Sequence, residues 1–378
     1  MEENILNKIT DIERNKAKIS FNAQKMTDEL LALIGEREAK ILRLRYGFEG
    51  QKSLTLDAIG KRFNLTRERV RQIENQAIKN IVKNKKYEEI VAPFNRLILD
   101  LVIEYGGVIS EVFLINKLKN IVNDQQESAV YIQFLLANFL SGLEKVAHSE
   151  FEHGWKSLDA TFDLVLEIIL TLENILTEKN TVMPETELLE HFTKSDYYKE
   201  KIDKINELLQ KSNNSLNYVI NSYLHASKKF TTTPFNQWGL SKWEYTNPKR
   251  INGKIYLVML HHQKPLHFTD IAEIINKNWA DHRSVKTATV HNELIFDQRF
   301  VLVGRGVYGL KEWGYTSGNV REVLKNILQE KGALSEEEII KIMSDKKMVK
   351  PATIKLALKD ENNFEKKDGK YIIKQVNN

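Results

Sequence analysis

Apolar residues between Leu54 and Ile81 recur with the spacing of two short helices, in the stretch "LTLDAIGKRFNLTRERVRQIENQAIKNI". The first helix is expected from about Thr55 to Phe63 and the second from about Arg67 to Ile81. Their apolar faces hold Leu56, Ile59 and Phe63 in the first helix and Val70, Ile73, Ala77 and Ile81 in the second. Two helices joined by a short turn predict a helix-turn-helix motif.

The turn between the two helices has residues suited to it. Asn64 tolerates the left-handed backbone that a tight inter-helix turn needs. Thr66 is a natural N-cap, because its hydroxyl can accept a hydrogen bond from an unpaired backbone N–H of the first helical turn.

The outward face of the second helix is polar and rich in paired donors and acceptors. At about 100° per residue, this face holds Glu68, Arg71, Gln72, Asn75 and Lys79. Arg67 flanks it at the first turn, and Arg69 projects from the other side. Arginine can pair with guanine, glutamine or asparagine with adenine, and glutamate with cytosine. The face therefore favours reading of double-stranded DNA; the alternative is a solvent-exposed helix with ion pairs along it.

The rest of the chain, from Pro93 to Val376, is predicted to be a degenerate repeat. "VKTATVHNELIFDQRFVLVGRGVYGL" from Val285 matches "VKPATIKLALKDENNFEKKDGKYII" from Val349. A third copy ends at Leu240, and a looser fourth ends at Leu158. Each copy predicts three helices followed by two short strands around a turn, which together make a winged helix.

Two details fit this interpretation of the repeats. Ser335 and Glu338 are spaced as a capping box for the second helix of the last copy. Gly304 and Gly306 are both expected to permit positive φ in a hairpin turn. The closing aromatic residues are expected to pack the hairpins against the helices; they are Trp155, Trp238, Tyr308 and Tyr371.

The predicted fold class is mainly α, a multi-domain array of a helix-turn-helix domain followed by tandem winged helices. The expected domains are a helical leader at 1–26, the helix-turn-helix at 27–90, and winged helices at 91–158, 159–243, 244–314 and 315–378.

The charge distribution supports a confined contact with an anion. The net charge of the 378 residues is only +5, yet nine Lys or Arg lie between Lys61 and Lys86 against Glu68 and Glu74. A solvated, lysine-rich helix end would give the same count. No apolar run approaches the length of a membrane span and no signal peptide begins the chain, so a cytoplasmic protein is expected.

Enzymatic chemistry is not expected. The chain has no cysteine, which excludes disulfides, thiol catalysis and thiolate zinc sites. His261, His262 and His267 lack a carboxylate at ligand spacing, and the Gly304–Gly306 segment lacks the context of a phosphate-binding loop. No catalytic group stands out. We expect no metal, cofactor or small-molecule substrate.

The helix-turn-helix stretch, with "LGEREAKILRLRYGF" before it, closely resembles region 4 of the sigma-70 family of bacterial transcription initiation factors. The resemblance covers about Asp28 to Val82, and "TRERVRQIE" is its most specific run. It implies a domain that reads the −35 promoter element and docks on the flap of RNA polymerase. The base-contacting residues that it implies are Arg67, Glu68, Arg71 and Gln72.

A second resemblance covers about Asn247 to Trp313. "KPLHFTDIAEII" with "RFVLVGRGVYGL" is similar to the HARE-type helix-turn-helix domain, which occurs in the delta subunit of bacterial RNA polymerase and in proteins tied to DNA modification or chromatin. It implies binding to DNA or to transcription machinery. The candidate residues are Lys286, Thr287, Thr289, His291 and Asn292 on the third helix and Arg305 in the wing.

The sequence therefore predicts a DNA-binding transcription regulator that acts with bacterial-type RNA polymerase. Only a short charged leader precedes the region 4-like stretch, which leaves no room for a −10 melting domain, so a complete sigma factor is not expected. One alternative is a polymerase-binding accessory protein or sigma mimic; another is a DNA-modification or defence module. Residues expected to contact phosphates or position the domain are Lys61, Thr66, Arg69, Asn75, Lys79 and Lys83.

Overall fold

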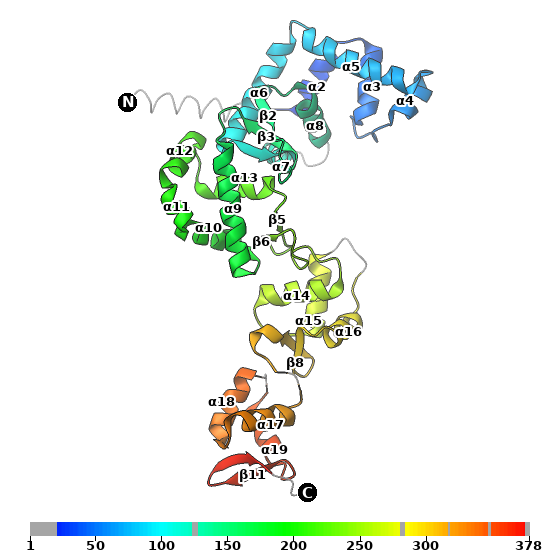
Figure 1. Ribbon diagram of the computed structural model, residues 1–378. Coiled ribbons are helices and arrows are strands. Elements are labelled where there is room, and N and C mark those ends of the chain that lie inside the picture. The colour runs from blue at the N-terminus through cyan, green and yellow to red at the C-terminus, as the bar shows by residue number, and fades with distance from the viewer. Residues whose placement is uncertain (1–20, 123–127, 280–283, 317, 347–348, 375–378) are drawn as a thin grey trace. The chain divides into compact units, whose positions relative to one another are not determined.

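The computed structural model describes residues 21–122, 128–279, 284–316, 318–346 and 349–374, and Figure 1 shows its elements. Most of the expected leader, residues 1–20, lies outside the described residues. The chain divides into two compact units, Met1–Phe230 and Thr231–Asn378. Each unit is mainly helical with small antiparallel sheets. Within the described residues, no helix combines the length and apolarity needed to cross a bilayer.

The first unit begins with four helices that include the helix-turn-helix. They are α2 (Ala23–Leu31), α3 (Glu36–Tyr46), α4 (Leu56–Phe63) and α5 (Arg67–Lys83). The two helices predicted from the apolar pattern correspond to α4 and α5. Helix α4 begins one residue later than expected because Thr55 is its cap, and α5 extends past Ile81 to Lys83.

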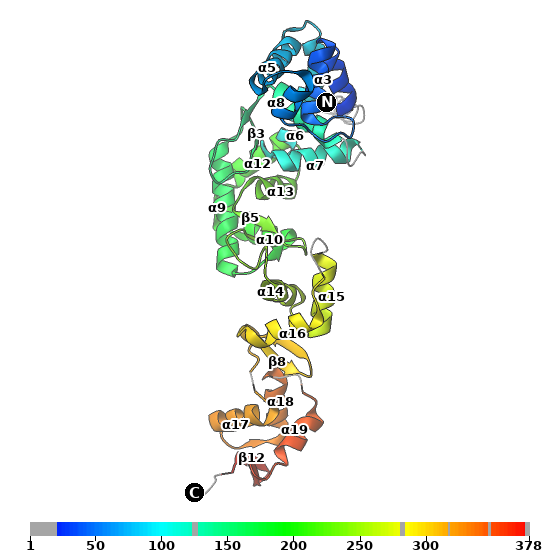
Figure 2. The ribbon, with the colours of Figure 1, turned by 90° about the vertical axis from the view of Figure 1, so that its right-hand side faces the viewer.

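The chain continues into a mixed segment with one three-stranded sheet. Its elements are α6 (Tyr87–Glu104), β1 (Val108–Ser110), α7 (Glu111–Val122), α8 (Ser128–Phe139), β2 (Leu143–Lys145) and β3 (Gly154–Ser157). The strand order is β1-β3-β2, antiparallel throughout, with Ile109 and Lys145 both paired to Trp155. In Figure 2, α8 lies among the other helices of this end of the unit, and the contacts of α8 with α2 and α7 agree with this view.

The remainder of the first unit is more helical than expected. Its elements are α9 (Phe162–Lys179), β4 (Met183–Pro184), α10 (Glu185–Lys194), α11 (Asp196–Glu200), α12 (Ile202–Ser212) and α13 (Leu216–Ala226). Helices α11 and α12 lie between the predicted second and third helices of this copy. Three helices are expected here, and the amphipathic stretch from Asp196 to Ser212 forms two more.

The second unit contains two segments with one order of elements. Two strands come first: β5 (Phe230–Thr232), which crosses the division, and β6 (Gln237–Leu240). The first segment contains α14 (Ile251–His262), β7 (Leu266–His267), α15 (Phe268–Asn278), α16 (Thr287–Phe296), β8 (Phe300–Gly304), β9 (Val307–Leu310) and the 3₁₀ turn η1 (Lys311–Trp313). The second segment contains α17 (Val320–Lys331), β10 (Leu334–Ser335), α18 (Glu336–Lys346), α19 (Pro351–Leu358), β11 (Phe364–Lys367) and β12 (Lys370–Ile373). Their sheets are ordered β7-β9-β8 and β10-β12-β11.

These sheets differ from the predicted two-stranded hairpins. A short strand before the second helix of a segment, such as β1, β7 or β10, adds a third strand to the sheet. The β8–β9 hairpin also differs in its turn: Gly306 has φ of 69°, whereas Gly304 ends β8 without a positive φ, next to a bulge at Leu302. The predicted capping box is confirmed, because the backbone N–H groups of Ser335 and Glu338 each donate to the other's side chain.

The hairpin aromatic residues pack inward as predicted. Trp155, Trp238 and Tyr308 are buried, and Tyr371 is half-buried against the last core. The two segments of the second unit each have their own apolar core, whereas the first repeat shares its core with α2, α3 and α5. The arrangement of domains, including tandem winged helices, stays a prediction.

Candidate nucleic-acid interface

The turn between α4 and α5 is fixed by local contacts. Asn64 adopts the left-handed conformation (φ 55°, ψ 47°), as its sequence position predicted. The backbone N–H of Leu65 donates to the carbonyl of Gly60 at 2.8 Å. A Cβ at position 60 would lie 2.6 Å from the carbonyl oxygen of Leu65, so only glycine permits this close approach of the turn to α4.

Helix α5 begins at a side-chain cap. The Thr66 hydroxyl accepts a hydrogen bond from the backbone N–H of Arg69 at 3.1 Å, which confirms the predicted N-cap. Thr55 caps α4 in the same way, accepting from Ala58 at 3.2 Å. Two capped helices and a left-handed residue between them set the direction of α5 relative to α4.

The apolar face of α5 is turned inward. Val70, Ala77 and Ile81 are fully buried, and Ile73 is half-buried against the same core as Val70. The opposite face is exposed along its whole length, as predicted from the helical projection. Its exposed members are Arg67, Glu68, Arg71, Gln72, Asn75 and Lys79.

The exposed side chains near the start of α5 are paired with one another. Glu68 accepts two hydrogen bonds from Arg71, at 2.9 Å to Nε and 2.7 Å to Nη2. Arg69 donates to Gln72 Oε1 at 3.2 Å. The hydrogen bond from Arg71 lowers the pKa of the Glu68 carboxyl, and Glu68 in turn raises the pKa of Arg71. Glu68 is therefore ionised at neutral pH, and its charge orients the guanidinium of Arg71 along the helix surface.

The flanking basic residues frame this face. Lys61 on α4 pairs with Asp57 at 2.9 Å, with both side chains mostly exposed. Lys83, in the last turn of α5, is exposed. Both lysines are accessible on the surface, and phosphate contacts by them stay a prediction.

One supporting group was missed by sequence reasoning. Glu74, on the partly buried side of α5, lies 3.7 Å from Arg45 of α3. Burial raises the pKa of Tyr46, and the nearby Glu74 carboxylate adds to that rise. Arg45 and Tyr46 lie about thirty positions before Glu74 in the sequence, and no local pattern links them.

The second candidate surface is only partly assembled on α16. Lys286 is the N-cap residue of this helix, and Lys286, Thr287, Asn292 and the hairpin residue Arg305 are exposed. Thr289 and His291 are half-buried. The His291 ring centroid lies 4.8 Å from that of Phe268 and 6.0 Å from that of Tyr308, so His291 joins helix to hairpin. A DNA or partner contact by these six residues stays a prediction.

Metal-binding side chains do not gather in the part of the chain that the structure describes: no three His, Asp or Glu residues there are placed to hold an ion. The exposed polar face of α5 is therefore the best-defined candidate site.

Comparison with known proteins matches the segment that carries this site. Residues 30–83 match the family Sigma-70, region 4. The RNA polymerase sigma factor SigA of Clostridium acetobutylicum is 45% identical over 53 residues, which cover 14% of this chain and 14% of that protein. The RNA polymerase sigma factor RpoD of Neisseria gonorrhoeae is 43% identical over 56 residues, 15% of this chain and 9% of that protein. The match spans only a small part of these relatives. Within this chain, residues 30–83 form a sigma-70 region 4 helix-turn-helix domain.

Proposed function

We propose that this protein is a DNA-binding transcription regulator that acts with bacterial-type RNA polymerase. Its region 4 domain reads a −35-like element through α5. The exposed set Arg67, Glu68, Arg71 and Gln72 carries the proposal, because it presents base-reading side chains on one turn and a half of a capped helix. The protein is not a complete sigma factor under this proposal.

We further propose that the segments after α5 are winged helices in tandem. The recurring element order and the sheet orders β1-β3-β2, β7-β9-β8 and β10-β12-β11 support this. The segment from α14 to η1 is proposed to be a HARE-type module. Several weak modules on one chain add affinity by raising effective concentration, without any one of them binding tightly.

A second candidate function is a polymerase-binding accessory protein or sigma mimic that contacts the flap and reads little DNA. The pairing of Arg71 with Glu68 favours it, because the carboxylate occupies the Nε and Nη2 edge, one of the two edges through which the guanidinium could bind guanine.

The proposal is tested by in vitro selection: the full chain binds fragments from a random DNA pool, with and without RNA polymerase, and the bound fragments are sequenced. Enrichment of one short element, weaker and relaxed at one base position in an Arg71→Ala variant, is the expected result. Co-purification with polymerase and no retardation of promoter DNA at low or high salt would instead select the accessory protein. If no DNA element is enriched and RNA polymerase does not co-purify with the protein, both candidate functions are contradicted.

A further inference from the structure

The third helix of the first repeat, α8, has no charged residue. Its sequence, "SAVYIQFLLANF", could not neutralise phosphates. Its side chains from Tyr131 to Leu136 are buried except Gln133, and Ala137 is also exposed. In a winged helix used for DNA reading, this helix would instead present polar side chains to solvent.

The region 4 domain packs against helix α8. The Phe48 ring stacks on Tyr131 with centroids 4.7 Å apart and 11° between the planes. Tyr46 meets Phe134 edge-on, with centroids also 4.7 Å apart. The last residues of α3 and the loop after it are therefore seated on α8.

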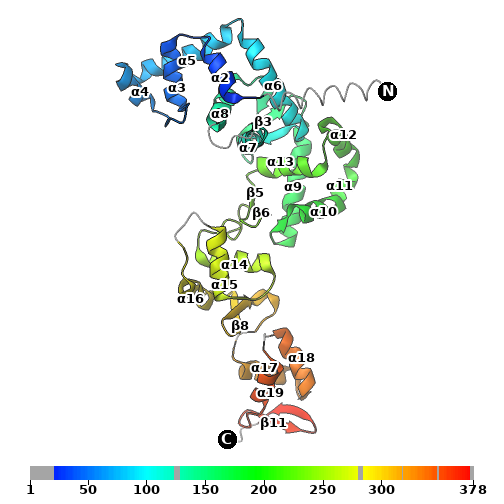
Figure 3. The same cartoon turned by 180° about the vertical axis from the view of Figure 1, so that it is seen from behind.

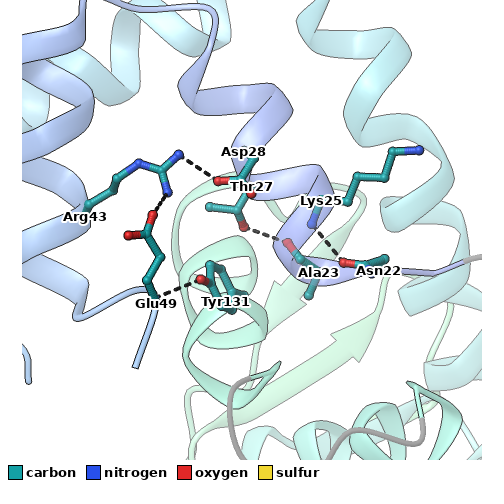
Figure 4. Close-up of polar contacts among 8 residues, drawn as sticks. All are labelled: Asn22, Ala23, Lys25, Thr27, Asp28, Arg43, Glu49 and Tyr131. Atoms are coloured by element: carbon teal, nitrogen blue, oxygen red, sulfur yellow. Dashed lines mark hydrogen bonds and ion pairs between the residues drawn. The ribbon is translucent and has the colours of Figure 1, made fainter. Parts of the chain in front are cut away.

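Polar contacts close the same junction, as Figure 4 shows. The backbone N–H of Glu49 donates to the Tyr131 hydroxyl at 3.0 Å. Arg43 lies between Asp28 at 2.7 Å and Glu49 at 2.6 Å. Arg43 therefore ties α2, α3 and the loop at Glu49 together beside α8.

Tyr46 connects this junction to the reading helix. It accepts a hydrogen bond from the Asn138 amide of α8 at 3.4 Å, and Glu74 of α5 lies close enough to influence its pKa. Ala77 and Ile81 of α5 also belong to the core that contains α8. Helix α5 is thus fixed by α4 at its start and by the α8 core at its end.

The third helix of the second repeat, α13, also packs against an earlier segment of the chain. Ser222 donates to the carbonyl of Val108 at 2.8 Å, and Tyr223 donates to that of Gly106 at 2.7 Å. Both side chains are fully buried, so α13 is packed on the strand and loop of the preceding repeat.

We propose that α8 and α13 are intrachain docking helices, and that α5 is the sole DNA-reading helix among residues 21–122 and 128–230. Tyr46, Phe48 and Phe134 are positioning residues that act through α5. This inference rests on the proposed function, and under it neither third helix of the first unit reads DNA.

Charge placed on the exposed face of α8 tests the absence of a DNA contact there. The full-length variant Gln133→Glu/Ala137→Glu is compared with Gln72→Glu/Asn75→Glu on α5, using a fluorescent duplex selected by the parent chain or, failing selection, a random duplex. The α8 variant should stay within about twofold of the parent, and the α5 variant should lose at least roughly tenfold. An equal loss in the α8 variant overturns this inference alone. No loss in either overturns it together with the proposed function.

Positioning is tested by a pair of matched phenylalanine substitutions. Phe134→Leu removes the ring that touches Tyr46 and Phe48, whereas Phe113→Leu on α7 removes a buried ring that touches Tyr105 and His225. Because the chain has no cysteine, spin labels at Lys52→Cys and Ala137→Cys report the junction alone. Phe134→Leu should broaden the label distance distribution and weaken DNA binding about three- to tenfold, and Phe113→Leu should do neither. A narrow distribution with parental affinity in Phe134→Leu overturns the positioning role.

Discussion

At the scale of single residues, the contact between Glu68 and Arg71 decides how α5 can read DNA. Their side chains are 59% and 55% exposed, so water and salt compete strongly with the pair. Because the pKa of Glu68 is lowered, the stabilisation from this pair is fully present above the usual pKa of a glutamate carboxyl. It is lost as the pH falls through the lowered pKa, where Glu68 becomes protonated. At neutral pH the pair is exposed and weak, so Arg71 can exchange Glu68 for a base edge at small cost.

Replacing Arg71 tests this exchange. Arg71→Ala should weaken binding to the selected duplex by roughly ten- to a hundredfold and relax one base position. Arg71→Lys should fall between, because lysine lacks the planar fork that pairs with guanine. Fluorescence anisotropy against the selected duplex and its single-base variants measures both effects. Arg37→Ala, an exposed arginine on α3, is the control and should change affinity little. Parental affinity in Arg71→Ala would rule out base reading by this residue.

Gly60 makes a second prediction at this scale. Gly60→Ala forces the turn away from α4, because the new Cβ would lie 2.6 Å from the Leu65 carbonyl oxygen. Overpacking against backbone should lower the free energy of unfolding by about 1–3 kcal/mol and weaken DNA binding as well. Chemical denaturation and anisotropy measure the two losses. Gly35→Ala, whose Cβ would meet only the Glu38 carboxylate at 3.8 Å, should keep DNA affinity. Unchanged stability and affinity in Gly60→Ala would show that the turn tolerates the shift.

At the scale of elements, α5 belongs to two cores. Its first half packs with α3 and α4 through Val70, and its second half packs with α6 and α8 through Ala77 and Ile81. In Figure 3, α4 lies at the far end of this group of helices from α6. The first half of α5 therefore keeps its polar face exposed beside a small core, and its second half is packed into the larger core.

The cations near the anchored end give a prediction on salt dependence. Lys79→Ala and Lys83→Ala should each reduce the slope of log affinity against log salt by about 1, because each removes one phosphate contact. The selected sequence should not change, since neither residue reads a base. Titrations over a range of salt concentrations measure the slopes. Lys52→Ala, an exposed lysine outside α5, is the control, and equal slopes in all three variants would exclude the assigned contacts.

Much of α4 and α5 could be predicted because their signals are local. Thr55, Asn64 and Thr66 act on residues three or four positions away, and the apolar stripe of α5 repeats within one helix. The exposed candidate face follows directly from that stripe. The proposed DNA contacts of this face rest on the hydrogen-bonding groups of its side chains and on the resemblance to sigma-70 region 4.

The missed features depend on contacts between distant segments. Strands β1, β7 and β10 are only two or three residues long, and they form because a strand much later in the chain pairs with them. The sequence of α8 has no charged residue, yet nothing in it indicates which segment packs against it. Seating Phe48 on Tyr131 joins residues 83 positions apart, beyond the reach of any periodicity.

At the scale of the whole molecule, the two units offer different third helices. Helices α8 and α13 of the first unit contain no lysine or arginine, whereas Lys286, the N-cap of α16, and Lys355 of α19 are exposed in the second unit. A second contact on the same chain would raise affinity for long DNA through effective concentration. The second unit is therefore where further DNA or partner contacts are expected.

The length of the DNA separates that second contact from reading by α5. The double variant Lys286→Glu/Arg305→Glu should weaken binding to a long duplex by roughly tenfold and leave binding to a short duplex, which spans only the selected element, near the parental value. The matched control Lys264→Glu/Lys277→Glu reverses two exposed charges of the same unit and should weaken the long duplex much less. Equal losses in both variants would assign the effect to net charge. No loss on either duplex would exclude a DNA contact by Lys286 and Arg305.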